Sequence, residues 1–185
     1  DSAMYHAKEQ GRNNFQFYSN SLNAAANERL VLEGALRHAI EREEFVVHYQ
    51  PQIDLRTGGI IGAEALVRWQ HPRRGLLLPA EFLPAAMDAG LIRMIDEWVL
   101  RTACRQNQAW QERGLMPVRM AVNVSHSLFH GSSLLSVVEE ALRQTGLTPA
   151  CLDLELTESV AMRNIEASIA ILSSLKAMGV QLSID

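Results

Sequence analysis

The chain has 185 residues, of which 48% are hydrophobic and 21% are charged, and its formal net charge at pH 7 is −4. This composition is typical of one globular domain with an ordinary core. The net negative charge does not provide the positive potential that attracts nucleic acid. With two cysteines and no apolar stretch near the roughly 20 residues of a membrane span, we expect reduced thiols and no transmembrane helix.

The N-terminal segment predicts the end of one domain followed by a connection. Residues 2–10 have helical spacing and Gly11 suits a helix C-cap, while residues 15–18 alternate like a short strand. One helix and one strand cannot bury a core, so we expect this piece to pack on something upstream. The missing initiator Met agrees with a fragment of a longer protein. Residues 19–42 then predict a connecting helix.

A β-hairpin is predicted next. Residues 45–49 are β-branched and aromatic, and Pro51 is expected to end this first strand. Residues 54–59 form a polar turn with two glycines, and residues 60–69 form the second strand. The short turn makes the two strands antiparallel.

The remaining chain alternates between helices and apolar strands. Helices are predicted over residues 79–89, 93–113, 134–145 and 165–178, and strands over residues 118–124, 151–156 and 180–185. Helix-sized spacers between strands indicate βαβ units and a parallel sheet. Such units build either an open doubly wound sheet or a closed barrel, and the absence of a glycine-rich dinucleotide or phosphate loop weakens the first option.

Four oxygen-bearing side chains end four of the apolar runs. They are Glu64, Asn123, Glu155 and Asp185, the last residue of the chain. The carboxyl ends of parallel strands are where sites assemble, and carboxylate and amide oxygens are what a hard divalent cation needs. None of the four is Cys or His, which argues against a zinc-type site. Any one of them alone would more commonly be a helix cap or a solvated loop charge, so the combination carries the prediction.

Five short motifs occur in order around these residues, and together they resemble the EAL domain, the family of cyclic-di-GMP phosphodiesterases. The motifs are Tyr49-Gln50-Pro51, Glu64-Ala65-Leu66 with Arg68-Trp69, Asn123-Val124-Ser125, Glu155-Leu156-Thr157-Glu158 and Ser183-Ile184-Asp185. The resemblance runs from about Phe45 to Asp185. Residues 4–13 are similar to the closing helix and turn of a GGDEF, or diguanylate cyclase, domain.

The resemblance implies a fold and a domain order. The fold is an α/β, incomplete (β/α)8 TIM-type barrel with an antiparallel first strand and about five of its eight strands present. Residues 1–18 would be the C-terminal end of a GGDEF domain, residues 19–44 a helical linker with the first EAL helix, and residues 45–185 a truncated EAL domain. Met87 stands where the family usually carries Glu.

The resemblance also assigns roles to the site residues. It implies that Glu64, Asn123, Glu155 and Asp185 hold Mg²⁺ or Mn²⁺ in a two-metal site, with Glu64, Glu155 and Asp185 as catalytic residues. Two metals would activate a water for in-line attack on a phosphodiester. Gln50 and Arg68 would bind substrate, the latter through its guanidinium on a phosphate. Glu158 would steady a loop over the site.

The implied function is hydrolysis of cyclic-di-GMP to the linear dinucleotide pGpG by the parent protein. The 185-residue piece is expected to be inactive, because further ligands of the family follow Asp185. We expect the parent to be a homodimer in the cytoplasm or at the cytoplasmic face of the inner membrane. A membrane tether would come only through an upstream region, and no nucleic-acid partner is expected.

Three other functions are compatible with parts of the sequence. A cyclic-di-GMP receptor that binds without cutting typically lacks ligands such as Glu64 or Glu155, which this chain retains. A scaffold role would use the helix at residues 19–42 for dimerisation. An aldolase-like or enolase-like lyase would need a Lys or His base placed at a strand end, and none lies on the second to fifth predicted strands.

Overall fold

The computed structural model describes residues 20–130, 134–162 and 164–184. The predicted helix at residues 2–10, the predicted strand at residues 15–18 and Asp185 lie outside the described residues. The described helices are α2 (Asn20–Ala39), α3 (Pro79–Asp88), α4 (Ile92–Glu112), α5 (His126–Phe129), α6 (Leu134–Thr145), α7 (Glu158–Met162) and α8 (Ile165–Ala177). The strands are β1 (Phe45–Ile53), β2 (Ile60–His71), β3 (Gly75–Leu77), β4 (Arg119–Asn123), β5 (Leu152–Leu156) and β6 (Gln181–Ile184), and a short 3₁₀ turn covers Pro149–Cys151.

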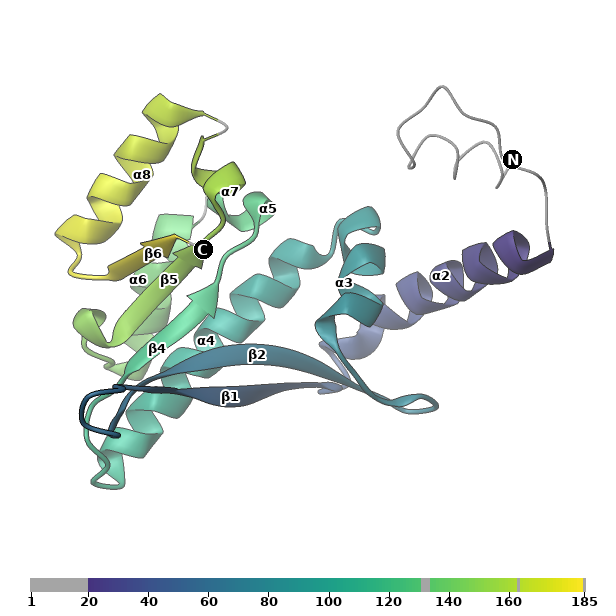
Figure 1. The fold of residues 1–185 in the computed structure, drawn as a ribbon. Helices are drawn as coiled ribbons and strands as arrows, with labels where there is room; N and C mark the ends of the chain where they lie inside the picture. Colours follow the sequence, from purple (N-terminus) through teal and green to yellow (C-terminus); the bar gives the residue numbers. More distant parts are fainter. Residues whose placement is uncertain (1–19, 131–133, 163, 185) are drawn as a thin grey trace.

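The strands form one six-stranded sheet in the order β1-β2-β4-β5-β6, with β3 pairing to β2 (Figure 1). The β1–β2 pair is antiparallel, whereas β2–β4, β4–β5 and β5–β6 are all parallel. This confirms the predicted antiparallel hairpin followed by βαβ units, in which each helix returns the chain so that the next strand runs in the same direction.

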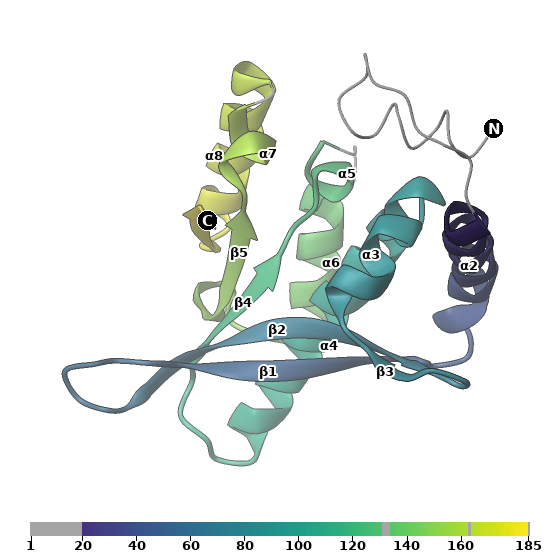
Figure 2. The same ribbon diagram turned by 45° about the vertical axis from the view of Figure 1, so that its right-hand side comes forward.

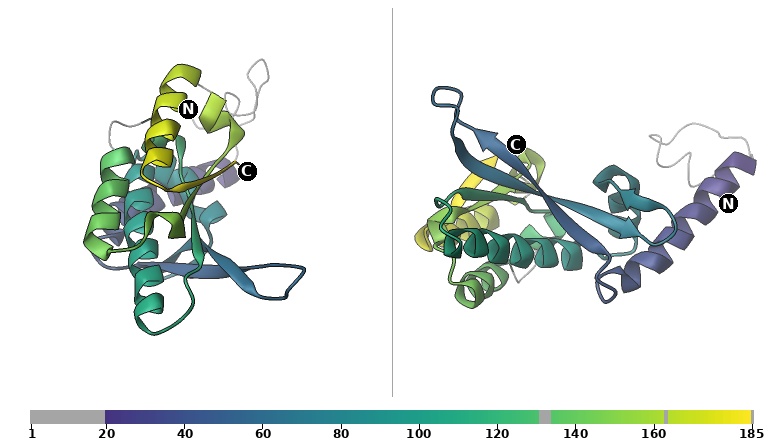
Figure 3. Two further views of the ribbon diagram at one scale, coloured as in Figure 1. Left: turned by 90° about the vertical axis from the view of Figure 1, so that its left-hand side faces the viewer. Right: turned by 90° about the horizontal axis from the view of Figure 1, so that it is seen from below.

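The two faces of the parallel sheet differ in character. Alternate residues such as Ala63, Met120, Val122, Leu152 and Leu154 are buried and belong to the hydrophobic core. Helices α4, α6 and α8 lie together on one side of the strands (Figure 3, left). Because strand side chains alternate between faces, the residues between the core positions point away from these helices.

That second face is polar, and this distinguishes the two architectures left open by the sequence. It carries Gln50, Glu64, Arg68, Asn123, Asp153, Glu155 and Ser183. A doubly wound sheet buries both faces under helices, whereas a (β/α)8 barrel has helices on the outside only. The described part of the chain is therefore part of a TIM-type barrel, with an antiparallel first strand.

Two predictions about the hairpin were wrong. Strand β1 does not end at Pro51 but continues to Ile53, and β2 extends beyond Trp69 to His71 and then turns back into β3. Among the described residues β1 pairs only with β2, so it is an edge strand, where a residue without a backbone N–H is tolerated. The β2–β3 turn escaped notice because β3 has only three residues.

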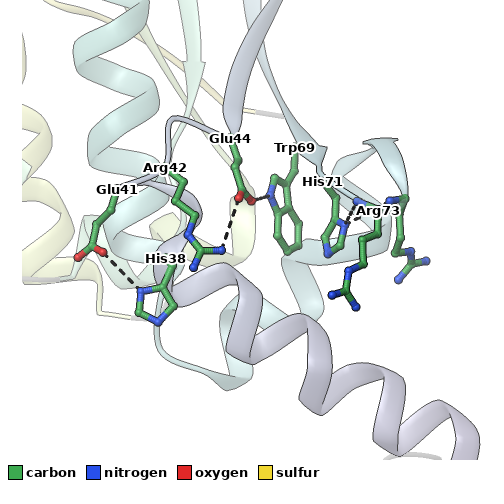
Figure 4. Close-up of polar contacts among 8 residues, drawn as sticks. His38, Glu41, Arg42, Glu44, Trp69, His71 and Arg73 are labelled. Atoms are coloured by element: carbon green, nitrogen blue, oxygen red, sulfur yellow. Dashed lines mark hydrogen bonds and ion pairs between the residues drawn. The ribbon is translucent and has the colours of Figure 1, made fainter.

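An aromatic cluster lies where the chain passes from α2 to β1 and β2, close to β3. Figure 2 shows the ribbon in this region, and Figure 4 shows the contact of Trp69 with Glu44. Trp69 is fully buried, and its ring lies 5.9 Å from Phe45 and 5.8 Å from Phe82 between centroids. Its indole Nε1 donates a hydrogen bond of 2.9 Å to the carboxylate of Glu44, and the backbone N–H of Gln70 donates to the Glu44 carbonyl at 2.7 Å. The connection from α2 is thus bonded directly to β2.

Both cysteines are free, and no helix in the described ranges has the length and apolar content that crossing a membrane requires. Cys104 lies in the core, where burial raises the pKa of its thiol to about 12. Such a thiol is almost entirely protonated at neutral pH and is poorly reactive.

Candidate active site

Three of the four predicted metal ligands lie on neighbouring strands of the polar face. Asn123 is the last residue of β4 and is paired in register with Glu155 of β5. Glu64 of β2 is paired with Ala121, two residues before Asn123 on the same face. Neighbouring strands are about 4.8 Å apart, so this register brings the three side chains to one region of the sheet.

Glu64 and Asn123 contact each other. The Asn123 amide Nδ2 donates a hydrogen bond of 2.8 Å to Glu64 Oε1, although 59 residues separate them in the chain. Glu64 ends an apolar run but not a strand: it lies in the middle of β2, as the predicted strand over residues 60–69 implied. Only Gly62–Ala65 of β2 pairs with β4, after which β2 leaves the parallel sheet with β1 and β3. Glu64 therefore sits at the end of the parallel part of β2.

The chemistry of these side chains fits a hard divalent cation. Glu64 and Glu155 offer carboxylate oxygens, and rotation of the Asn123 amide presents its oxygen in place of Nδ2. No three His, Cys, Asp or Glu side chains form a cation cluster within the described ranges. The predicted fourth ligand, Asp185, lies outside them. The described residues thus provide an oxygen-only donor set with two acidic members and one amide.

The predicted substrate-binding residues flank this group on the same face. Gln50 of β1 is exposed and is paired in register with Glu64. Arg68 lies four residues beyond Glu64, so their Cα atoms are about 13 Å apart along the strand. Arg68 Nη1 donates to the carbonyl of its neighbour Val67 at 2.8 Å. The predicted contact of its guanidinium with a substrate phosphate would require it to turn from this backbone contact.

The exit of β5 leads into a short helix rather than a simple turn. Glu158 is exposed and begins α7. The hydroxyls of Thr157 and Ser159 lie 3.0 Å apart, and His130 Nε2 lies 3.0 Å from the carbonyl oxygen of Val160. The His130 contact attaches α7 to the end of α5, and Glu158 lies three residues after Glu155, where the chain leaves β5.

Two acidic residues near the site were missed by sequence reasoning. Asp153 of β5 is buried on the polar face, and both its carboxylate oxygens accept hydrogen bonds from the Ser183 hydroxyl at 2.9 and 3.0 Å. It precedes Glu155 by two residues, so alternation would have indicated the shared face. Asp96 of α4 bonds to Ser125 just after β4. No local pattern identifies that contact, because Asp96 belongs to a helix.

Comparisons with known proteins agree with this geometry. The EAL domain family matches residues 33–185. Over 185 residues the chain is 50% identical to the bifunctional diguanylate cyclase/cyclic di-GMP phosphodiesterase MucR of Pseudomonas aeruginosa, covering 100% of this chain and 27% of MucR. Over 183 residues it is 42% identical to the cyclic di-GMP phosphodiesterase NbdA of the same organism, covering 99% of this chain and 23% of NbdA.

A solved structure is similar as well. The phosphodiesterase PaMucR in complex with c-di-GMP superposes with a TM-score of 0.80 at 48% identity, covering 84% of this chain and 63% of that chain. The chain spans about a quarter of the length of the curated relatives that it matches.

Proposed function

The chain belongs to the EAL domain family, and from this premise we propose that the protein hydrolyses cyclic-di-GMP to pGpG. The observation that carries the proposal is the meeting of Glu64 with Asn123, which is paired in register with Glu155. These residues come from three strands, and their oxygens suit the divalent cation that phosphodiester hydrolysis requires.

We propose that Glu64, Asn123 and Glu155 hold Mg²⁺ or Mn²⁺, with Asp185 as a further ligand and Glu64, Glu155 and Asp185 as the catalytic residues. Bound divalent cations supply the Lewis acidity that polarises the phosphodiester and lowers the pKa of water. Before a cation binds, the Asn123 amide holds the Glu64 carboxylate beside it through the hydrogen bond from Nδ2, and rotation of the amide then presents its oxygen to the cation. In the reaction a water oxygen forms a bond to phosphorus while the bond to the 3′ oxygen breaks and that oxygen gains a proton.

The neighbouring residues bind and enclose the substrate. Gln50, which is paired in register with Glu64, is placed to hydrogen-bond the dinucleotide. The Arg68 guanidinium offers two parallel N–H donors for a phosphate. Glu158, at the start of α7, steadies the rim over the substrate. We also propose a homodimer in the cytoplasm or at the cytoplasmic face of the inner membrane, with residues 1–18 belonging to an upstream GGDEF domain.

The decisive test is turnover of cyclic-di-GMP by the purified complete protein. We expect pGpG to form with Mg²⁺ or Mn²⁺ and to disappear when EDTA is added. Tight binding of cyclic-di-GMP without linear product under these conditions would reject the hydrolase and favour the receptor. The expectation that the 185-residue chain alone is inactive stays a prediction, and the same assay on that chain tests it.

Replacing Arg68 with alanine is expected to raise KM for cyclic-di-GMP by about 10- to 100-fold, because charge-assisted hydrogen bonds to a phosphate are lost. Lysine should recover part of the affinity, since it keeps the charge but not the two parallel donors. Steady-state kinetics measure both effects. The matched control is Arg119→Ala, an exposed arginine at the opposite end of β4, which should leave KM unchanged. An unchanged KM in Arg68→Ala would remove Arg68 from the substrate site.

A further inference from the structure

The carboxylate of Asp96, on the first turns of α4, holds the segment that follows β4. The backbone N–H of Ser125 donates to Asp96 Oδ2 at 3.1 Å. The Ser125 hydroxyl accepts from the backbone N–H of Leu128 at 3.4 Å and so caps α5. Ser125 is thereby bound to a residue of α4, Asp96, that lies 29 residues earlier in the chain.

The residue before Ser125 is held from the other side. The backbone N–H of Val124 donates to the carbonyl of Glu155 at 2.9 Å, and the Val124 side chain is buried in the core. Asn123 immediately precedes Val124 and Ser125, whose backbone N–H groups are hydrogen-bonded to β5 and α4. Its backbone is therefore restrained by β5 and by α4 at the point where its amide must reach Glu64.

Asp96 suits this task chemically. It is partly buried, and burial raises the pKa of its carboxyl group to about 6 while hydrogen bonding from Ser125 limits the rise. At pH 7.5 the group is therefore mostly ionised and can accept the hydrogen bond from the Ser125 N–H. Hydrogen bonds to an ionised acceptor are about twice as strong as neutral ones.

We propose that Asp96 is a positioning residue of the active site, which sets the exit of β4 so that the Asn123 amide and Glu64 converge on the cation. This inference rests on the proposed function, since it assigns Asn123 to the cation site. It adds a residue from helix α4 to a cation site whose described ligands, Glu64, Asn123 and Glu155, all lie on strands. Partners behind metal ligands commonly alter metal affinity or activity by about 10- to 100-fold.

The test compares Asp96→Ala with Asp96→Asn in the complete protein. Asp96→Ala should lower kcat by about 10- to 100-fold and weaken Mn²⁺ binding, measured by electron paramagnetic resonance titration, by a similar factor. KM for cyclic-di-GMP should stay within about threefold of the wild-type value, because the substrate contacts of Gln50 and Arg68 remain. Asp96→Asn should recover most of the kcat and most of the Mn²⁺ affinity, since its amide oxygen still accepts from the Ser125 N–H.

A purely structural role for Asp96 predicts a different result. The matched control is Val99→Ala, which removes buried apolar volume one turn further along α4 and should destabilise the protein without changing Mn²⁺ affinity. Wild-type Mn²⁺ affinity in Asp96→Ala, or a loss no larger than in Val99→Ala, would overturn the proposal. If Asp96→Ala does not fold, Asp96→Leu takes its place, because leucine fills the volume of the side chain but cannot accept from the Ser125 N–H, and a loss of about 10-fold in Mn²⁺ affinity is expected. Wild-type affinity there would equally overturn it.

The Mn²⁺ titration separates this inference from the proposed function. A wild-type protein that binds Mn²⁺ but releases no pGpG would refute the hydrolase, while weaker Mn²⁺ binding in Asp96→Ala would still support the positioning role. Conversely, an active wild type with an equally active Asp96→Ala variant would refute the positioning role alone.

Discussion

Replacing Glu155 with glutamine is expected to lower kcat for cyclic-di-GMP hydrolysis by about 10³-fold or more, equivalent to about 4 kcal/mol in the activation barrier. The substitution keeps the size of the side chain but removes a negative charge from the candidate cation site. Glu155 is the register partner of Asn123, so its carboxylate lies where the cation is expected. Without that charge, cation affinity and transition-state stabilisation both fall.

Glu64→Gln should produce a loss of similar size, and the double variant should lose little more than either single one, because the two carboxylates act on the same cations. Product formation by chromatography at saturating Mg²⁺ or Mn²⁺ measures these losses. Cyclic-di-GMP binding should survive, since Gln50 and Arg68 are intact. The matched control is Glu139→Gln, the same chemical change at an exposed position of α6, which should be fully active. Wild-type turnover by Glu155→Gln would contradict the assignment of the site.

Replacing Trp69 with alanine is expected to lower the free energy of unfolding by about 3–5 kcal/mol, the usual cost of deleting a large buried aromatic side chain. Trp69 is completely buried, and its ring packs against Phe45, Phe82 and His71. Its loss leaves a cavity among these rings. It also leaves the carboxylate of Glu44, whose side chain is only 13% exposed, without the indole N–H that it accepts from.

The measurement is urea denaturation followed by circular dichroism. Trp69→Phe should cost clearly less than alanine, because most of the cavity is filled and only the indole hydrogen bond is lost. Trp110→Ala provides a second comparison, since Trp110 also contacts an aromatic ring, that of Tyr49 at 4.9 Å, but is only partly buried. A free energy of unfolding for Trp69→Ala within 1 kcal/mol of the wild-type value would show that the aromatic cluster does not anchor β2.

Local patterns were enough to predict most elements. Helix α6 spans Leu134–Thr145 as its apolar spacing predicted, and Gly146, with a φ of 72°, ends it. Periodicity and a glycine stop are both properties of a short window, so they can be read from the chain alone. The exit of β4 was harder, because the four-residue helix α5 is too short to show any period.

Errors arose where an element depended on its neighbours. Proline usually ends a strand, yet Pro51 lies inside β1 because that strand is at the edge of the described sheet. Likewise, the predicted second strand stopped at Trp69, two residues short of the end of β2. In the folded chain β2 exchanges its parallel partner β4 for β3 further along and continues to His71.

The sequence by itself determined most of the elements, the alternation of side chains along the strands, and the oxygen donors Glu64, Asn123 and Glu155, because side-chain alternation and residue chemistry are local. Only the tertiary structure decided that the Asn123 amide reaches Glu64 and that Asp96 reaches Ser125. Those contacts depend on strand register and on how α4 packs against the sheet. Strand register and the packing of α4 are set by which side chains are buried across the whole domain. A short stretch of sequence does not contain that information.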